Sequence, residues 1–114
     1  MSESPTDILS TLTKEIVAFR DERDWEQFHN GKDLSMCIAI EAAELQEVFL
    51  WKKPEEADVS KVKEELADIL IASLLLAHQY EFDLPEIIRA KLKRNKEKYP
   101  VEKARGSNRK YNEL

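Results

Sequence analysis

Cysteine, glycine and proline are scarce in this sequence, and each scarcity excludes a class of structure. Cys37 is the only cysteine among 114 residues, which excludes an intrachain disulfide and a thiolate metal cluster. Two glycines and four prolines provide few turns, while charged residues make up 36% of the chain. This balance favours long helices over a turn-rich β fold. The length allows one domain, residues 1–114, whose thin core favours association with further copies of the chain.

Long apolar runs are also missing. The most apolar stretch, residues 69–77, is interrupted by Ser73 and is far shorter than the ~20 residues that a bilayer-spanning helix needs. The first ten residues lack the basic flank and apolar stretch of a secretory signal. We therefore expect a cytoplasmic protein with no membrane partner.

Charge of one sign is concentrated at each end of the chain. Residues 1–88 carry a net charge of −12 and residues 89–114 a net charge of +7, within a formal total of −5. The basic end could contact the phosphates of a small molecule, a nucleic acid or an acidic part of another subunit, although such a surface is commonly just solvated. Because the whole chain is acidic, we expect no stable binding of nucleic acid.

Four helical segments account for the hydrophobic pattern, and no stretch alternates long enough to predict a strand. The helices are expected at about residues 5–23, 33–53, 55–80 and 84–98. Ser4 or Thr6 would cap the first helix and Asp33 the second. The polar residues 101–114 are typical of a disordered tail, although Tyr111 and Leu114 would allow it to dock on a neighbour. The predicted fold class is all-α.

The most informative feature is the position of four acids among apolar neighbours. In IAIEAAEL, residues 38–45, only Glu41 and Glu44 are polar, and Asp68 interrupts a similar apolar stretch one turn after Glu65. Each pair has i, i+3 spacing, so its two carboxylates lie on one helix face. Like charges buried this close together are costly unless something compensates them.

A hard divalent cation would compensate these charges directly, because Mg²⁺ binds carboxylate oxygens and keeps several waters. The predicted metal ligands and catalytic residues are Glu41, Glu44, Glu65 and Asp68. Magnesium held in this way suits a phosphate-bearing substrate that is attacked by a metal-activated water.

Two other interpretations of the acids remain open at this point. The carboxylates could face solvent or pair with Lys52, Lys61 or Lys63. A ferritin-like di-iron site would need Glu-x-x-His on facing helices, and neither His29 nor His78 occurs in that pattern.

Cations and aromatic residues could supply the remaining contacts to a nucleotide. Phosphates would be met by Lys91, Asn95 and Arg109, since lysine and arginine are common phosphate ligands. A base could stack on Trp25, Phe28, His29 or Trp51, although such residues are also typical core or interface anchors. The Gln27 amide could form hydrogen bonds with a base edge.

Several motifs resemble one known family. EAAE at 41–44 and ELAD at 65–68 resemble the paired-carboxylate signature of the MazG-like all-α nucleoside triphosphate pyrophosphohydrolases. The family signature often has an additional glutamate before the first pair, where this chain has Ile40. The segments most similar to the dCTP pyrophosphatase branch are RDWEQFH at 23–29, FLWK at 49–52, KEELADILI at 63–71, FDLP at 82–85, NKEKYP at 95–100 and SNRKY at 107–111.

The resemblance implies a four-helix subunit that works as a dimer or as a tetramer of two dimers, with substrate pockets between subunits. It implies Mg²⁺-dependent hydrolysis of a (deoxy)nucleoside triphosphate, such as dCTP, to the monophosphate and pyrophosphate. It also suggests a biological role in removing noncanonical nucleotides from the nucleotide pool. By position, the four acids would be the metal ligands, residues 25–29 and Trp51 would line the nucleoside pocket, and Lys91, Asn95 and residues 109–111 would meet the phosphates.

Two positions depart from the mammalian dCTP enzymes, which have a histidine where this chain has Ile16 and a tyrosine where it has Ala72. The resemblance therefore does not fix the preferred base, nor whether modified nucleotides are the targets. An alternative is a catalytically silent nucleotide-binding or assembly protein on the same fold, although a pure scaffold would gain stability by replacing buried acids with apolar residues.

Overall fold

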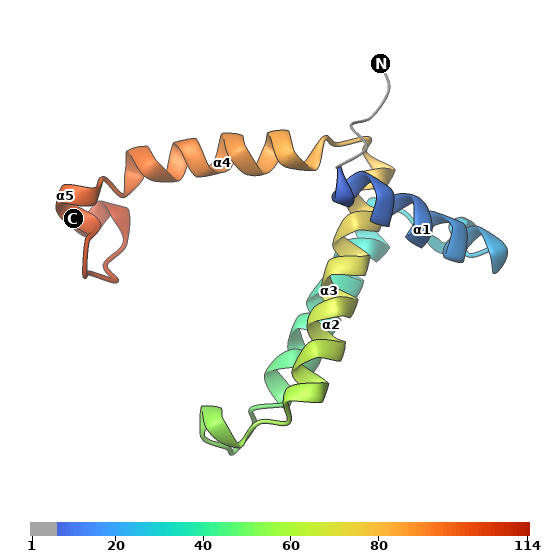
Figure 1. Cartoon of the computed structure of the whole chain (residues 1–114), viewed down its shortest axis with the longest axis horizontal. Coiled ribbons are helices and arrows are strands. Elements are labelled where there is room, and N and C mark those ends of the chain that lie inside the picture. Colours follow the sequence, from blue (N-terminus) through green and yellow to red (C-terminus); the bar gives the residue numbers. More distant parts are fainter. Residues whose placement is uncertain (1–6) are drawn as a thin grey trace. The chain divides into compact units, whose positions relative to one another are not determined.

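The structure is a computed structural model that describes residues 7–114, and no strand occurs among them. The helices are α1 (Ile8–Glu22), α2 (Gly31–Glu47), α3 (Val59–Gln79), α4 (Leu84–Lys98) and the short α5 (Val101–Ala104), as Figure 1 shows. Short 3₁₀ turns occur at η1 (Glu26–Phe28), η2 (Pro54–Glu56) and η3 (Tyr111–Glu113). The predicted all-α fold class is confirmed.

The chain forms two compact units, Met1–Phe82 and Asp83–Leu114. The first contains α1, α2 and α3, and the second contains α4, α5 and η3. The expectation that residues 1–114 act as a single domain stays a prediction.

The centre of the first unit is the antiparallel pair of α2 and α3, which lie side by side (Figure 1), and α1 also packs on α3. The buried apolar side chains of this unit are Leu34, Val48, Ala72, Leu74, Leu75 and Ala77. Four of them come from the second half of α3, which matches the apolar stretch in the sequence. This packing fixes which turns of α2 and α3 face each other, and so positions the acids.

The start of α2 and the end of α3 fit closely at Gly31. The Asn30 side chain caps α2 by accepting a hydrogen bond from the Asp33 N–H at 2.8 Å. A Cβ atom on Gly31 would lie 2.8 Å from Cζ of Tyr80 and would collide with its hydroxyl. Tyr80 in turn stacks on Phe82, with ring centroids 5.4 Å apart and an interplanar angle of 16°. An alanine at this position would therefore require the exposed Tyr80 ring to move away from the helix start.

The boundaries predicted for α2 were wrong at both ends. The helix begins at Gly31 because Asn30, rather than Asp33, is the cap. It ends at Glu47 and not at Lys53, because the chain turns through residues 48–52 and Trp51 adopts a positive φ of 61°.

The starts of the other two helices of this unit also differ from expectation. The α3 helix starts at Val59, after the separate turn η2, because the Asp58 side chain accepts from the Ser60 N–H at 2.9 Å. For α1 the cap is Asp7, whose carboxylate accepts from the Ser10 N–H at 3.3 Å. The predicted caps Ser4 and Thr6, and the predicted first helical residue Pro5, lie outside the described residues.

The second unit is α4 with a C-terminal segment folded onto its end. The Asp83 carboxylate caps α4 by accepting from the Glu86 N–H at 3.1 Å. The rings of Tyr99 and Tyr111 meet edge to face at 6.3 Å, and Lys98 Nζ lies 4.8 Å from the centroid of the Tyr111 ring. The prediction of a disordered tail was therefore wrong. Tyr111 instead anchors the segment to the last turn of α4.

Within residues 7–114, no helix combines the length and the apolar character that crossing a bilayer requires.

Candidate metal and nucleotide site

Three of the four predicted metal ligands come together in the first unit. Glu41 and Glu44 lie one turn apart on α2, and Glu65 lies on the facing part of α3. One carboxylate oxygen from each of the three lies within 4.8 Å of the others. The i, i+3 spacing aligns the first two on one helix face, and the packing of α2 on α3 supplies the third.

Glu41 and Glu65 are held in an environment that disfavours their charge. Both residues are half-buried, and among the described residues the Oε2 atom of each is buried without a hydrogen-bond partner. Burial, followed by the proximity of Glu44 and the charge of Asp68, raises the pKa of Glu41 to about 7. Burial and Glu44 likewise raise the pKa of Glu65. Without a compensating cation, these carboxylates destabilise the fold at high pH.

The donor set fits a hard divalent cation. All three donors are carboxylate oxygens, the ligand type that Mg²⁺ prefers. Among residues 7–114, two of the three have a buried oxygen with no hydrogen-bond partner. A spread of 4.8 Å is small enough for slight side-chain rotations to bring all three onto one ion. The residues present therefore fit the metal that the sequence analysis expected.

Asp68, the fourth predicted ligand, is exposed and is not part of the three-residue group. Its negative charge nevertheless raises the pKa values of Glu41 and Glu65, so it lies on the same side of α3. The interpretation in which lysines neutralise these acids finds no support, because in the described part of the chain none of the lysines named for that role forms an ion pair.

The predicted aromatic residues between α1 and α2 are well exposed. Trp25 is 44% exposed and Phe28 is 63% exposed. The Trp25 ring meets the Phe19 ring edge to face, at 5.8 Å and 77°. Trp25 and Phe28 therefore offer ring surface to a ligand or to another chain.

Gln27 and His29, in the same segment, differ in which hydrogen-bonding atoms are available to a ligand. The Gln27 amide nitrogen already donates to the Asp24 carbonyl at 3.0 Å and to its carboxylate at 3.2 Å. Only the Gln27 amide oxygen is then left for the predicted base contact. His29 is half-buried, and among the described residues its Nδ1 atom is buried without a partner.

A pocket of about 560 Å³ lies at the end of α2 and contains Trp51. The residues that line it are Ala43, Gln46, Glu47, Phe49, Leu50 and Trp51. Trp51 is 94% exposed, so its ring has almost no packing partner within its own unit. Ala43 belongs to the same turns of α2 as the acids, so this pocket adjoins the carboxylate cluster in sequence.

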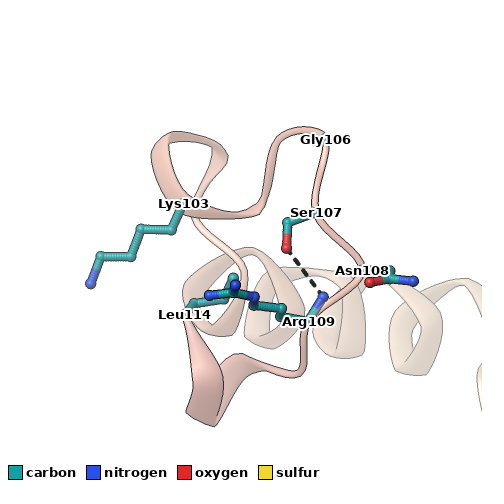
Figure 2. A pocket seen from close by; sticks show the side chains of 6 residues that line it. All are labelled: Lys103, Gly106, Ser107, Asn108, Arg109 and Leu114. Carbon is teal, nitrogen blue, oxygen red and sulfur yellow. Dashed lines mark hydrogen bonds between the residues drawn. The ribbon is translucent and has the colours of Figure 1, made fainter.

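The predicted phosphate contacts all lie in the second unit. On α4, Lys91 is exposed and Asn95 is half-buried. Arg109 lines a pocket of about 960 Å³ whose other residues are Lys103, Gly106, Ser107, Asn108 and Leu114. Figure 2 shows the Arg109 guanidinium beside Leu114, and the Arg109 N–H donates to Ser107 Oγ at 3.2 Å.

Sequence reasoning missed two residues that bear on the site. Phe49 lines the pocket with Trp51, and its position in an apolar run beside a tryptophan could have indicated this. Arg20 is 5% exposed and is the buried charged residue of the described chain. It gave no signal, because it occurs in a segment, FRDERD, where every other charged residue is exposed.

The chain is similar to one protein family, to curated relatives and to a solved structure. Residues 36–114 match the MazG-like family. The chain is 38% identical over 121 residues to dCTP pyrophosphatase 1 of Bos taurus, covering 99% of this chain and 70% of that protein. It is 37% identical over 121 residues to dCTP pyrophosphatase 1 of Homo sapiens, covering 99% and 71%. The crystal structure of a pyrophosphatase from Archaeoglobus fulgidus DSM 4304 superposes with a TM-score of 0.78 at 33% identity, covering 88% of this chain and 99% of that one.

Proposed function

Because the chain belongs to the MazG-like family and is a nucleoside triphosphate pyrophosphohydrolase, we propose that it hydrolyses deoxynucleoside triphosphates such as dCTP with Mg²⁺ as cofactor. The products are the monophosphate and pyrophosphate, and the role is control of the nucleotide pool. The observation that carries the proposal is the group of three carboxylates within 4.8 Å, two of which have a buried oxygen without a partner in the part of the chain that the structure describes.

Glu41, Glu44 and Glu65 would hold the metal, and Asp68 would join them by turning its exposed side chain toward the group. Bound there, Mg²⁺ supplies positive charge to the phosphate oxygens and lowers the pKa of a water molecule. The carboxylates position that water, since their oxygens accept its hydrogen bonds. The water adds across the anhydride between the α and β phosphates, so that one P–O bond forms and one breaks.

The nucleoside would be held by exposed rings of the first unit. Trp25, Phe28 and Trp51 are each at least 44% exposed, and base–aromatic stacking contributes about 1–3 kcal/mol per base. The oxygen of Gln27 and the unpartnered Nδ1 of His29 provide polar contacts in the same segment.

The triphosphate would be met by cations of the second unit, namely Lys91 and Arg109, together with the Asn95 amide. These residues can form charge-assisted hydrogen bonds with phosphate oxygens. The segment that carries these cations, residues 89–114, has a net charge of +7, which favours binding of a polyphosphate.

Association into a dimer or a tetramer is part of the proposal. On α2, Met36 and Ile40 are 52% and 55% exposed, and on α3, Leu66 and Leu70 are 47% and 55% exposed. Large apolar side chains this exposed, in the same helices that carry the acids, favour burial against a second copy. Light scattering on the purified protein should give a mass of at least two chains.

The preferred base is best decided by experiment, because the two departures from the dCTP enzymes affect the pocket in different ways. Ile16 is half-buried on α1, whereas Ala72 is 7% exposed and belongs to the core of α3. A tyrosine at Ala72 would have to leave that core to reach a ligand.

A substrate panel tests the proposal. Ordinary and 5-modified deoxynucleoside triphosphates, and the four ribonucleotides, would be incubated with Mg²⁺ and the products identified by phosphorus NMR. We expect pyrophosphate and a monophosphate, with dCTP or a modified dCTP among the best substrates. Release of orthophosphate alone would contradict the proposed reaction. Tight binding without turnover would favour the alternative of a catalytically silent nucleotide-binding protein.

A further inference from the structure

Arg20 is a buried cation in the last turn of α1, with 5% of its surface exposed. Its guanidinium contacts two carboxylates. Both Nε and Nη2 lie 2.9 Å from Oδ1 of Asp21, and Nη2 also lies 3.4 Å from Oε2 of Glu26. The two acids are 50% and 69% exposed at their side chains, so the arginine forms the interior end of this small network.

The same residue holds the following segment through its backbone. The Arg20 carbonyl accepts a hydrogen bond from the Trp25 N–H at 3.1 Å. Between them the chain reverses at Asp24, which adopts a positive φ of 55°. One residue of α1 therefore binds the chain at two adjacent positions, Trp25 by its carbonyl and Glu26 by its guanidinium.

What Arg20 holds is a small rigid turn that carries exposed rings. The Phe28 N–H donates to the Trp25 carbonyl at 2.9 Å, and the His29 N–H donates to the Glu26 carbonyl at 3.0 Å. Because these bonds fix η1 internally, the orientation of Glu26 also fixes the orientation of Trp25 and Phe28.

Apolar packing gives this turn only limited support. Trp25 contacts the edge of Phe19, whose face is covered by the Arg23 guanidinium at 3.8 Å. With Trp25 and Phe28 exposed by 44% and 63%, little hydrophobic free energy opposes movement of the turn. The charge-assisted contact of the buried arginine with Glu26 therefore adds a side-chain restraint on the turn to the backbone hydrogen bond between Trp25 and Arg20.

We propose that Arg20 is a positioning residue that orients Trp25 and Phe28 at the end of α1 for stacking on the nucleobase. The inference rests on the proposed function, because it assigns these rings to the nucleoside. Arginine suits the position better than lysine, since its planar fork can contact Asp21 and Glu26 together while its charge is always present.

Kinetics on four variants test the proposal. Glu26→Gln removes the exposed partner's charge, Arg20→Ala removes the fork, and Arg20→Lys keeps the charge. The matched control is Glu22→Gln, an exposed acid at the same end of α1 whose carboxylate lies 3.9 Å from Arg23 Nη1.

We expect KM for the best triphosphate to rise about threefold in Glu26→Gln and about tenfold in Arg20→Ala, in keeping with ion pairs whose partners are solvent-exposed. The effect on kcat should be less than twofold, because the carboxylate cluster is untouched. Arg20→Lys should recover part of the loss in KM, and the control Glu22→Gln should behave as wild type.

Fluorescence provides a readout that does not depend on turnover. The chain has two tryptophans, so a Trp51→Phe background leaves Trp25 as the only reporter. Acrylamide quenching of Trp25 should increase in Arg20→Ala and in Glu26→Gln, and should not change in the control. If Arg20→Ala does not fold, Glu26→Gln decides the matter, because its side chain is exposed.

The outcomes separate this inference from the proposed function. Failure of the wild type to hydrolyse any triphosphate would refute the proposed function, and the quenching data would still decide whether Arg20 holds the turn. An active wild type with unchanged KM or unchanged quenching in the folded variants would overturn the inference alone. So would equal losses in kcat and kcat/KM accompanied by a lower Tm without recovery in Arg20→Lys, since those would indicate a merely structural residue.

Discussion

Glu41 on α2 and Glu65 on α3 face each other with carboxylate oxygens within 4.8 Å, and each has an Oε2 atom that is buried without a partner in the described part of the chain. Neither residue alone would be unusual. Burial and the neighbouring Glu44 raise the pKa of both carboxyls, so ionising the pair is costly unless a ligand of opposite charge compensates it.

Replacing Glu41 with glutamine should abolish hydrolysis and yet stabilise the metal-free protein. We expect activity with Mg²⁺ to fall by about 100-fold or more, as for loss of a metal ligand or its close support, while Tm in chelator at pH 8 rises. Steady-state assays and thermal unfolding measure the two effects. Glu64→Gln is the matched control, because this neighbouring acid on α3 is exposed and outside the group. Equal activity in the two variants would be inconsistent with the site.

The stability of the metal-free protein should fall as pH rises. The pKa of Glu41 is raised from 4.5 to about 7, so the folded state holds this proton more tightly than the unfolded state does. The resulting stabilisation is fully present below about pH 4.5 and is lost as pH rises through about 7. Urea unfolding in chelator between pH 5 and pH 8 measures it. The slope should be smaller in Glu41→Gln, and a stability that increases over this range in wild type alone would argue against the buried pair.

Trp51 should contribute to substrate binding and very little to folding. Its ring is 94% exposed and lines the pocket at the end of α2. Trp51→Ala should raise KM about tenfold, from the loss of one stacking contact of about 1–3 kcal/mol, while the free energy of unfolding changes by less than about 0.5 kcal/mol, as is usual for exposed positions. Trp51→Phe should remain near wild type in KM. A large loss of stability in Trp51→Ala would show that the ring packs elsewhere.

Gly31→Ala should destabilise the first unit through Tyr80. The added Cβ would lie 2.8 Å from the tyrosine Cζ and would collide with the hydroxyl, so the expected cost is about 1–3 kcal/mol, as for overpacking. Denaturant unfolding measures it. Because the hydroxyl is the closest atom, Tyr80→Phe should recover part of the loss when combined with Gly31→Ala. Additive effects in the double variant would mean that the two residues do not meet.

The hydrophobic pattern was enough to predict the helices and the partly buried positions of Glu41 and Glu65, but not the exposure of Asp68. It failed at helix ends, where short-range competition decides. Asn30 and Asp33 are both good caps, and the hydrogen bond from the Asp33 N–H to the Asn30 side chain shows which one is used. Residues 49–51 read as a continuation of α2, but Trp51 takes a left-handed conformation there.

Contacts between distant side chains were also beyond the sequence. The i, i+3 rule pairs Glu41 with Glu44 and Glu65 with Asp68, but it does not tell which acid of α3 faces α2. The structure brings Glu65 into the group and leaves Asp68 exposed. The burial of Arg20 could not be predicted either, because the charged residues that follow it are exposed and the hydrophobic periodicity does not set it apart from them.

The most direct test of the account is the binding of a divalent cation to the carboxylate group itself. Mn²⁺ titrations followed by electron paramagnetic resonance would be carried out on wild type, Glu41→Gln, Glu65→Gln and the control Glu64→Gln, with a non-hydrolysable dCTP analogue present. We expect binding by wild type and the control, and affinity at least about tenfold lower in Glu41→Gln and Glu65→Gln. Equal Mn²⁺ affinity in all four proteins would contradict the central claim that these buried acids are there to hold a metal ion.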